Sequence, residues 1–130
     1  MLVIPSIPSQ ISEVESYLNR IIEKLKIDTE RYPDILISLT EAVNNAIIHG
    51  NKGDQKKVVK IEMQEEHKTI KFIVSDEGLG FSIDNIPDPT CAENIECCGG
   101  RGVLIMSSLC DEINFQNNGS TVEMSFQIQR

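Results

Sequence analysis

The chain has 130 residues, with 20 Asp and Glu against 12 Lys and Arg, and its net charge is −8. This length predicts a single domain over residues 1–130 that buries a real core. The acidic balance argues against a nucleic-acid binder and against a protein that binds anionic membranes, because both need clustered Lys and Arg. No apolar run approaches the ~20 residues of a membrane span, so we expect a cytoplasmic protein.

The first predicted elements are a short strand and a helix. Leu2 to Pro5 predicts an edge strand, because Pro5 and Pro8 cannot donate hydrogen bonds to a neighbouring strand. Ser9 is placed to cap a helix over residues 10–26. The helix carries one apolar stripe, at Ile11, Val14, Leu18, Ile21, Ile22 and Leu25. Packing on a sheet explains a stripe of this width, and docking of a partner protein is the alternative.

The second predicted helix runs from Tyr32 to His49, with Pro33 in its first turn, where proline is tolerated. Its apolar positions recur every three or four residues, at Tyr32, Ile35, Leu36, Leu39, Val43, Ala46 and Ile47. Glu41 and Asn45 are four residues apart, so they stack on one face about one turn from each other. Gly50 is placed to end the helix as a C-terminal cap. Polar side chains on a helix face are usually solvated, so the other motifs must decide their role.

Two strands are predicted next, after a polar loop over residues 51–55. Apolar and polar side chains alternate around Val59, Ile61 and Met63, and again around Ile70, Phe72 and Val74. With a turn at 65–68 they form a hairpin with one buried face. The second strand leads into Asp76, Gly78 and Gly80. An acid at a strand end, followed by two glycines, places a carboxylate beside backbone that a ligand can approach closely.

The last part of the chain predicts a loop, a helix and a hairpin. Residues 82–98 show no periodicity, as in long loops that form lids or binding loops. Gly99 to Gly102 closes this loop and opens a third helix, from Val103 to about Leu109. Glycine-rich backbone at a helix N-terminus is an anion site, because free N–H groups and the helix dipole act together. Asn117-Asn118-Gly119 is a type I′ turn signal between strands at 113–115 and 120–128.

The four cysteines are Cys91, Cys97, Cys98 and Cys110, and none of their spacings is typical of a zinc ribbon. Cys97 and Cys98 are adjacent and cannot easily bridge each other. We therefore predict reduced thiols, as is usual for cytosolic cysteines. A metal or redox switch at Cys97 and Cys98 is the alternative.

Together, three helices and about five strands predict an α+β fold. It is a two-layer α/β sandwich, with a mixed, mostly antiparallel sheet that helices cover on one face. A nucleotide site needs a polar group that binds the flat base and backbone N–H groups that bind the phosphates. The carboxylate and the glycine-rich segment could supply these two parts. The chain lacks the Walker sequence. Its glycines do not follow the first strand of a βαβ unit, which excludes a Rossmann site.

Three motifs resemble, in order, the boxes of the GHKL (Bergerat-fold) ATPase superfamily. They are Glu41-Ala-Val-Asn-Asn45, Asp76-Glu-Gly78-Leu-Gly80 and Gly100-Arg-Gly102. Within that superfamily, residues 40–50 and 118–122 are very similar to bacterial anti-sigma-factor serine/threonine kinases. The resemblance covers essentially the whole chain, and three boxes at these separations are specific.

The resemblance implies cofactors and roles for the first two motifs. ATP and Mg²⁺ would be the cofactors, with Asn45 as the metal ligand. Glu41 would be the general base on the attacking hydroxyl or water. Asp76 would accept a hydrogen bond from the adenine amino group, while Gly78 and Gly80 would let the backbone approach the base.

The resemblance also implies a phosphate site and an ATP lid at about 82–100. Gly100 and Gly102, with the helix that opens at Val103, would hold the phosphates. Arg101 is a candidate phosphate contact. His49 either lines the site or is a helix-end histidine that the dipole favours.

The implied function is a Mg-ATP-dependent serine kinase and anti-sigma factor. It would phosphorylate a STAS-domain anti-anti-sigma antagonist and sequester a sigma factor, as a homodimer that binds neither nucleic acid nor membrane. An ATP-binding switch that sequesters a partner with little or no turnover is the alternative. The catalytic domain of a histidine kinase ranks last, because His49 and His67 are the only histidines and neither lies in an upstream dimerisation helix.

Overall fold

The computed structural model describes residues 1–27, 29–77, 100–116 and 120–128. Its strands are β1 (Leu2–Pro5), β2 (Val58–Glu66), β3 (Thr69–Ser75), β4 (Glu112–Gln116) and β5 (Thr121–Gln127). They form one sheet in the order β1-β2-β3-β5-β4, and all four pairings of neighbouring strands are antiparallel. β1 therefore lies at an edge, as Pro5 and Pro8 predict. Within the described strands the sheet is antiparallel throughout rather than mixed.

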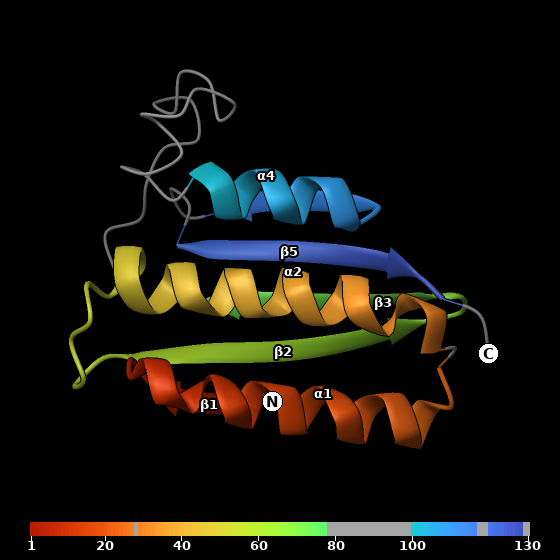
Figure 1. Ribbon diagram of the computed structural model, residues 1–130, viewed down its shortest axis with the longest axis horizontal. Helices are drawn as coiled ribbons and strands as arrows, with labels where there is room; N and C mark the ends of the chain where they lie inside the picture. Colours follow the sequence, from red (N-terminus) through yellow and green to blue (C-terminus); the bar gives the residue numbers. More distant parts are fainter. Residues whose placement is uncertain (28, 78–99, 117–119, 129–130) are drawn as a thin grey trace.

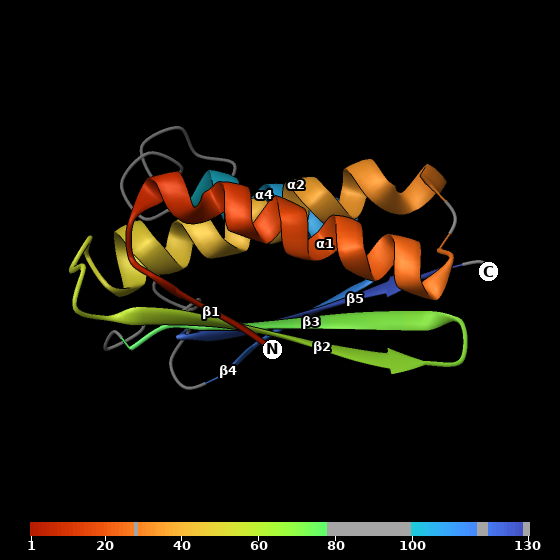
Figure 2. The ribbon, with the colours of Figure 1, turned by 90° about the horizontal axis from the view of Figure 1, so that it is seen from below.

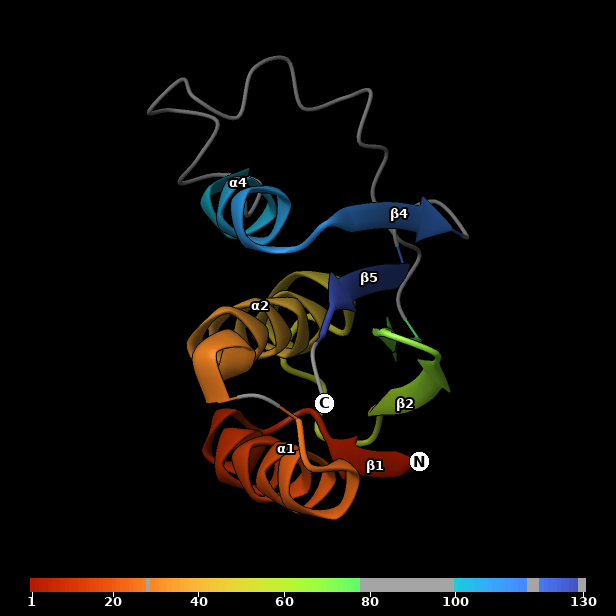
Figure 3. The same cartoon turned by 90° about the vertical axis from the view of Figure 1, so that its right-hand side faces the viewer.

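Helices α1 (Ile11–Leu25), α2 (Tyr32–Asn45) and α4 (Gly100–Leu109) cover one face of this sheet (Figures 1 and 2). α2 lies between the other two (Figure 3). Three short helical turns, η1 (Pro8–Gln10), η2 (Thr29–Arg31) and η3 (Ala46–Gly50), adjoin α1 and α2. The chain thus has the predicted two-layer α+β architecture. None of the helices in the described ranges is long and apolar enough to cross a membrane.

The core lies between the helices and the covered face of the sheet. The sheet buries Val59, Ile61, Ile70, Phe72, Val74, Val122, Met124 and Phe126. Val14, Leu18 and Ile21 of α1 are buried in the same core, which confirms that the apolar stripe of this helix packs within the domain. The Phe72 and Phe126 rings meet edge to face, with centroids 6.5 Å apart.

The start of α1 differs from the prediction. The helix begins at Ile11, and the 3-10 turn η1 leads straight into it, so Gln10 already has helical dihedral angles. Ser9 therefore does not act as an N-cap; instead its carbonyl oxygen accepts a hydrogen bond from the Ser12 hydroxyl, at 3.2 Å. The predicted cap is wrong because Pro8 starts a helical turn one residue earlier.

The end of the second helix also differs. The α-helix stops at Asn45 and continues as a π-helix, η3, in which the Asn51 N–H donates to the Ala46 carbonyl at 2.8 Å. Gly50 is part of that turn, and the positive φ angles fall later, at Lys52 (54°) and Gly53 (71°). The helical segment therefore ends at Gly50, as predicted, but the residue in the C-cap position is Asn51 and not Gly50.

Cys110 is the one cysteine within the described residues, and it is a free thiol, as predicted. Its sulfur donates to the Met106 carbonyl at 2.8 Å. Burial raises the pKa of the Cys110 thiol, which lowers its reactivity at neutral pH. Cys91, Cys97 and Cys98 lie outside the described residues.

Arg31 joins three elements at the end of the sheet where α2 begins. Its Nη2 atom donates to Asp111 Oδ2 at 3.1 Å and to the Leu109 carbonyl at 3.5 Å. Its guanidinium carbon lies 5.6 Å from the centroid of the Phe126 ring. The same Asp111 oxygen accepts the Gln127 N–H at 2.6 Å, so the pair connects η2, the end of α4 and β5.

Replacing Arg31 with alanine should lower the free energy of unfolding by about 1–2 kcal/mol, mainly through lost packing on Phe126. The ion pair adds little, because the Arg31 and Asp111 side chains are 28% and 38% exposed. Urea unfolding followed by circular dichroism measures the change. Arg20→Ala, at an exposed position of α1, is the control and should lie within about 0.5 kcal/mol of the wild type. Equal effects of the two variants would contradict the role of Arg31.

Candidate functional site

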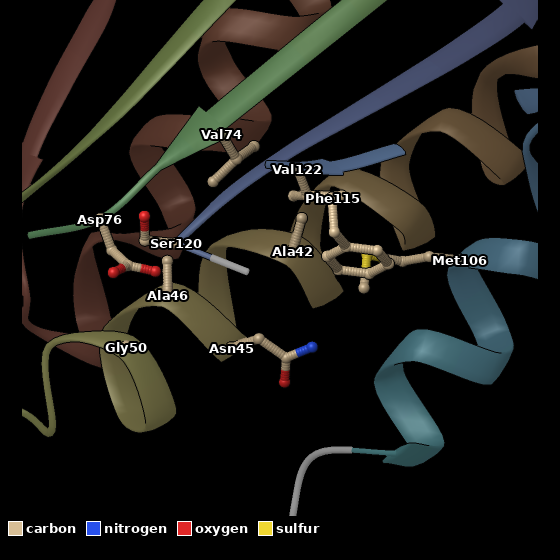
Figure 4. Close-up of a pocket in the computed structure, with 10 residues that line it drawn as sticks. All are labelled: Ala42, Asn45, Ala46, Gly50, Val74, Asp76, Met106, Phe115, Ser120 and Val122. Carbon is tan, nitrogen blue, oxygen red and sulfur yellow. The ribbon is translucent and has the colours of Figure 1, made fainter. Parts of the chain in front are cut away.

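A pocket opens where β3 ends, between the C-terminal half of α2 and α4. It encloses about 330 Å³, including space that is open to solvent. Figure 4 shows its lining residues, which are Ala42, Asn45, Ala46, Gly50, Val74, Asp76, Met106, Phe115, Ser120 and Val122. They come from α2, η3, β3, α4, β4 and β5, so segments distant in sequence build a single site.

Apolar side chains form most of the lining, and polar groups stand at a few places only. Val74, Met106 and Val122 are buried beneath it, and Ala42 and Ala46 leave room because their side chains are small. Asn45 and Asp76 supply a carboxamide and a carboxylate. An apolar slot with one carboxylate suits a flat heterocycle that carries an amino group, since the carboxylate accepts its hydrogen bond.

Asn45 is the last residue of α2, one helical turn after Glu41. Its side chain is half-buried and reaches the pocket between α2 and α4 (Figure 4). Within the described residues no three His, Cys, Asp or Glu side chains gather where they could hold a metal ion. A single carboxamide fits Mg²⁺, because this ion keeps several waters and takes the rest of its shell from phosphates and one or two protein oxygens.

Asp76 is the first residue after β3. Its N–H donates to the Ser120 carbonyl at 2.8 Å, which extends the β3–β5 pairing by one residue. Its carboxylate lies directly against the Gly50 backbone (Figure 4). A Cβ atom at Gly50 would lie 2.7 Å from Asp76 Oδ1, and nearer still to Cγ and Oδ2. Any side chain at position 50 would therefore push the Asp76 carboxylate out of this place.

Sequence reasoning missed the part that Asn51 plays, since it placed this residue in a polar loop. Asn51 is 1% exposed, and its side-chain oxygen accepts the Glu77 N–H at 2.8 Å. No local pattern announces this contact, because its two residues are 26 positions apart.

The remaining predicted site residues are placed as follows. Glu41 is half-buried on α2 and is not among the residues that line the pocket. His49 is exposed on η3 and also stands outside the lining. Gly78 and Gly80 lie outside the described residues.

The phosphate motif lies within a helix rather than before it. α4 begins at Gly100, so Gly100, Arg101 and Gly102 precede Val103 in its first turn, and the predicted start at Val103 is three residues late. The first-turn N–H groups of a helix have no partner within the helix, so the segment keeps the donors of an anion site. The first turn of α4 lies at the same end of the molecule as η3 (Figure 1).

The chain is similar to known proteins over most of its length. Residues 4–126 match the profile of the histidine kinase-like ATPase domain. The anti-sigma F factors of Bacillus thuringiensis (strain Al Hakam) and Bacillus mycoides (strain KBAB4) are each 32% identical over 126 residues, covering 90% of this chain and 86% of theirs.

Two solved structures share the fold. The histidine kinase domain of the Erythrobacter litoralis EL346 blue-light activated histidine kinase has a TM-score of 0.59 at 19% identity, over 95% of this chain. The blue-light activated histidine kinase itself gives a TM-score of 0.58 at 21% identity, over 78% of this chain. The chain spans 61% of the former and 32% of the latter. At these identities the likeness concerns the fold alone.

Proposed function

Because the chain belongs to the family of histidine kinase-like ATPase domains and is a relative of the anti-sigma F factors, we propose that it is a Mg-ATP-dependent serine/threonine kinase and an anti-sigma factor. In this proposal it phosphorylates a serine of a STAS-domain anti-anti-sigma antagonist. It also sequesters a sigma factor and so regulates transcription, as a cytoplasmic homodimer.

The observation that carries the proposal is the convergence of Asn45 and Asp76 on one largely apolar pocket. Asn45 and Asp76 are 31 positions apart in the sequence, and each supplies a group that a different end of ATP needs. Asp76 would accept the adenine amino group, and the apolar lining would cover the ring. Asn45 would face the phosphates, toward α4.

Mg²⁺ would be held by the Asn45 side-chain oxygen and, when bound, would neutralise charge on the phosphates. The first turn of α4, with Gly100, Gly102 and Val103, would donate backbone N–H groups to the phosphate oxygens. Arg101 would add a positive charge there. Phosphoryl transfer requires mainly this positioning and neutralisation, and a site with one such cation is expected to be slow.

Glu41 would take the proton of the attacking serine hydroxyl, as a general base one helical turn from the metal ligand. His49 would contact the nucleotide only from the rim, because it is exposed on η3. Residues 1–130 would form one domain. Gly78 and Gly80 would let the backbone approach the base, and residues at about 82–100 would form the ATP lid.

Transfer of label from γ-labelled ATP into an extract of the source organism tests the proposal. We expect a single small labelled protein that bears phosphoserine. Glu41→Ala should lower the rate of labelling by about 10²–10⁴, the usual worth of a general base, without preventing nucleotide binding. Glu13→Ala, at an exposed position of α1, is the control and should label at the wild-type rate. Equal labelling by the wild type and Glu41→Ala would contradict the role of Glu41.

The alternative is an ATP-binding switch that sequesters a protein partner with little or no turnover. One observation favours it: Glu41 does not line the pocket that contains Asn45 and Asp76. Labelled free phosphate without a labelled protein would identify an ATPase switch. Bound ATP without any turnover would favour sequestration.

A further inference from the structure

We infer that Asn51 is a positioning residue that fixes the direction of the Asp76 carboxylate and thereby sets the preference of the pocket for adenine. The inference rests on the proposed function, in which Asp76 accepts the amino group of the base. Asn51 does not line the pocket, so it would act only through Asp76.

Hydrogen bonds hold the peptide group on each side of the Asp76 Cα atom. On the N-terminal side, the Asp76 N–H donates to the Ser120 carbonyl at 2.8 Å. On the C-terminal side, the Glu77 N–H donates to Asn51 Oδ1 at 2.8 Å. Two fixed peptide planes determine the backbone dihedral angles of the residue between them. The direction of the Asp76 Cα–Cβ bond therefore depends on the Asn51 contact.

Asn51 is itself held in a closed ring of three residues. Its Nδ2 atom donates to the Val58 carbonyl at 3.0 Å, and the Val58 N–H donates to Glu77 Oε2 at 2.6 Å. The Glu77 N–H then returns to Asn51 Oδ1. The ring connects the end of η3, the first residue of β2 and the residue after Asp76.

The orientation of the Asn51 amide is dictated by its partners. The Glu77 N–H can only donate and the Val58 carbonyl can only accept, so a flipped amide would oppose like groups at both contacts. Nδ2 also donates to Ser6 Oγ at 2.8 Å, and Asn51 and Ser6 are each 1% exposed. Water therefore cannot readily replace these hydrogen bonds if Asn51 is removed.

The Asp76 carboxylate has little room to move without losing its hydrogen bond to the adenine amino group. This carboxylate rests against the Gly50 backbone, directly before Asn51 in the chain. Gly50, the last residue of η3, thus supplies the surface that the carboxylate touches, and the next residue, Asn51, supplies the side-chain oxygen that holds the following peptide. A change of the Asp76 backbone angles would therefore move the carboxylate relative to the base.

The test compares two nucleotides that differ only in the 6-amino group, ADP and purine riboside 5′-diphosphate, by titration calorimetry with Mg²⁺. Neither has a γ-phosphate, so the ratio of their affinities is an equilibrium quantity. The wild type should prefer ADP by about tenfold or more, the worth of a hydrogen bond to a charged acceptor. Asn51→Ala should bring this ratio close to one.

Ser6→Ala is the matched control, because it removes a buried hydrogen bond of Asn51 but leaves the Glu77 contact intact. This variant should melt at a lower temperature and keep the wild-type preference for ADP. If Asn51→Ala does not fold by circular dichroism, Asn51→Ser replaces it with the same expected ratio.

A folded Asn51 variant that keeps the wild-type ratio, even with both affinities lowered equally, overturns the inference and leaves the proposed function standing. Equal affinities of the wild type for the two nucleotides overturn the adenine-reading role of Asp76, and the inference with it.

Discussion

Gly50→Ala should lower the affinity for ADP roughly 100-fold, which equals about 2.7 kcal/mol, while the domain still folds. The added methyl group would occupy the space of the Asp76 carboxylate, which must turn away from the base. The backbone itself tolerates alanine here, because Gly50 has no positive φ and lies in a helical turn. Titration calorimetry measures the binding, and circular dichroism follows the melting of the free protein.

Gly53→Ala gives the opposite pattern and serves as the control. Gly53 has a φ of 71° and nothing within 4 Å of its Cβ position. Alanine there should destabilise the fold by about 1 kcal/mol through backbone strain, without a change in ADP affinity. If Gly50→Ala bound ADP with the wild-type affinity, Asp76 could move without weakening binding. Residues other than Asp76 would then recognise the adenine.

Asn45→Ala should abolish the part of the ATP-induced thermal stabilisation that depends on Mg²⁺. Ligand at 100 times its dissociation constant stabilises the native state by about 2.7 kcal/mol. For a domain of this size, that is roughly 10 °C in Tm. Removing the carboxamide removes the protein ligand that the proposal gives to the ion, so Mg-ATP should stabilise the variant no more than ATP with a chelator. Differential scanning fluorimetry with and without EDTA measures both shifts.

Asn44→Ala is the matched control for this experiment. Asn44 is the same residue type, is half-buried on the same helix, and does not line the pocket. It should keep the full magnesium-dependent shift. An Asn45→Ala variant with the wild-type shift would remove Asn45 from the metal site and direct attention to other oxygens.

The strands could be predicted from the sequence because their signal is local. Period-two alternation around Val59 and Phe72 depends only on which face of the sheet is buried, and the structure buries those side chains. The hairpin turn is tighter than expected: only His67 and Lys68 separate the strands, and Lys68 takes a φ of 75°. The strand pairing extends through Glu66 and Thr69, although polar residues there carry no alternation.

The helix ends were predicted less well, because tertiary contacts decide them. Because glycine has a low helix propensity, the sequence predicts that the helix starts after Gly100 and Gly102. In the structure both residues belong to α4. The π-helix over Ala46–Gly50 has the same apolar spacing as an α-helix over so few residues, so periodicity cannot reveal it.

Only part of the candidate site could be predicted, because tertiary contacts also build the site. Motif resemblance pointed to Asn45 and Asp76, and both line one pocket. The contact of Asp76 with Gly50 and the hydrogen bond from Glu77 to Asn51 each join residues that are 26 positions apart. Local sequence patterns cannot predict contacts over such a separation. Only the folded chain brings these groups together.

The π-helix fixes the number of residues in this segment, in addition to the glycine at position 50. Ile48 and His49 are exposed, so many side chains would fit at those positions. Deleting one residue between 46 and 50, however, would restore a regular α-helix and turn the following residues by about 100° around its axis. Asn51 would then leave its partners, and the glycine would no longer stand beneath the carboxylate. Along a lineage, substitutions should therefore accumulate at the exposed positions 48 and 49, while insertions and deletions are excluded from the whole stretch.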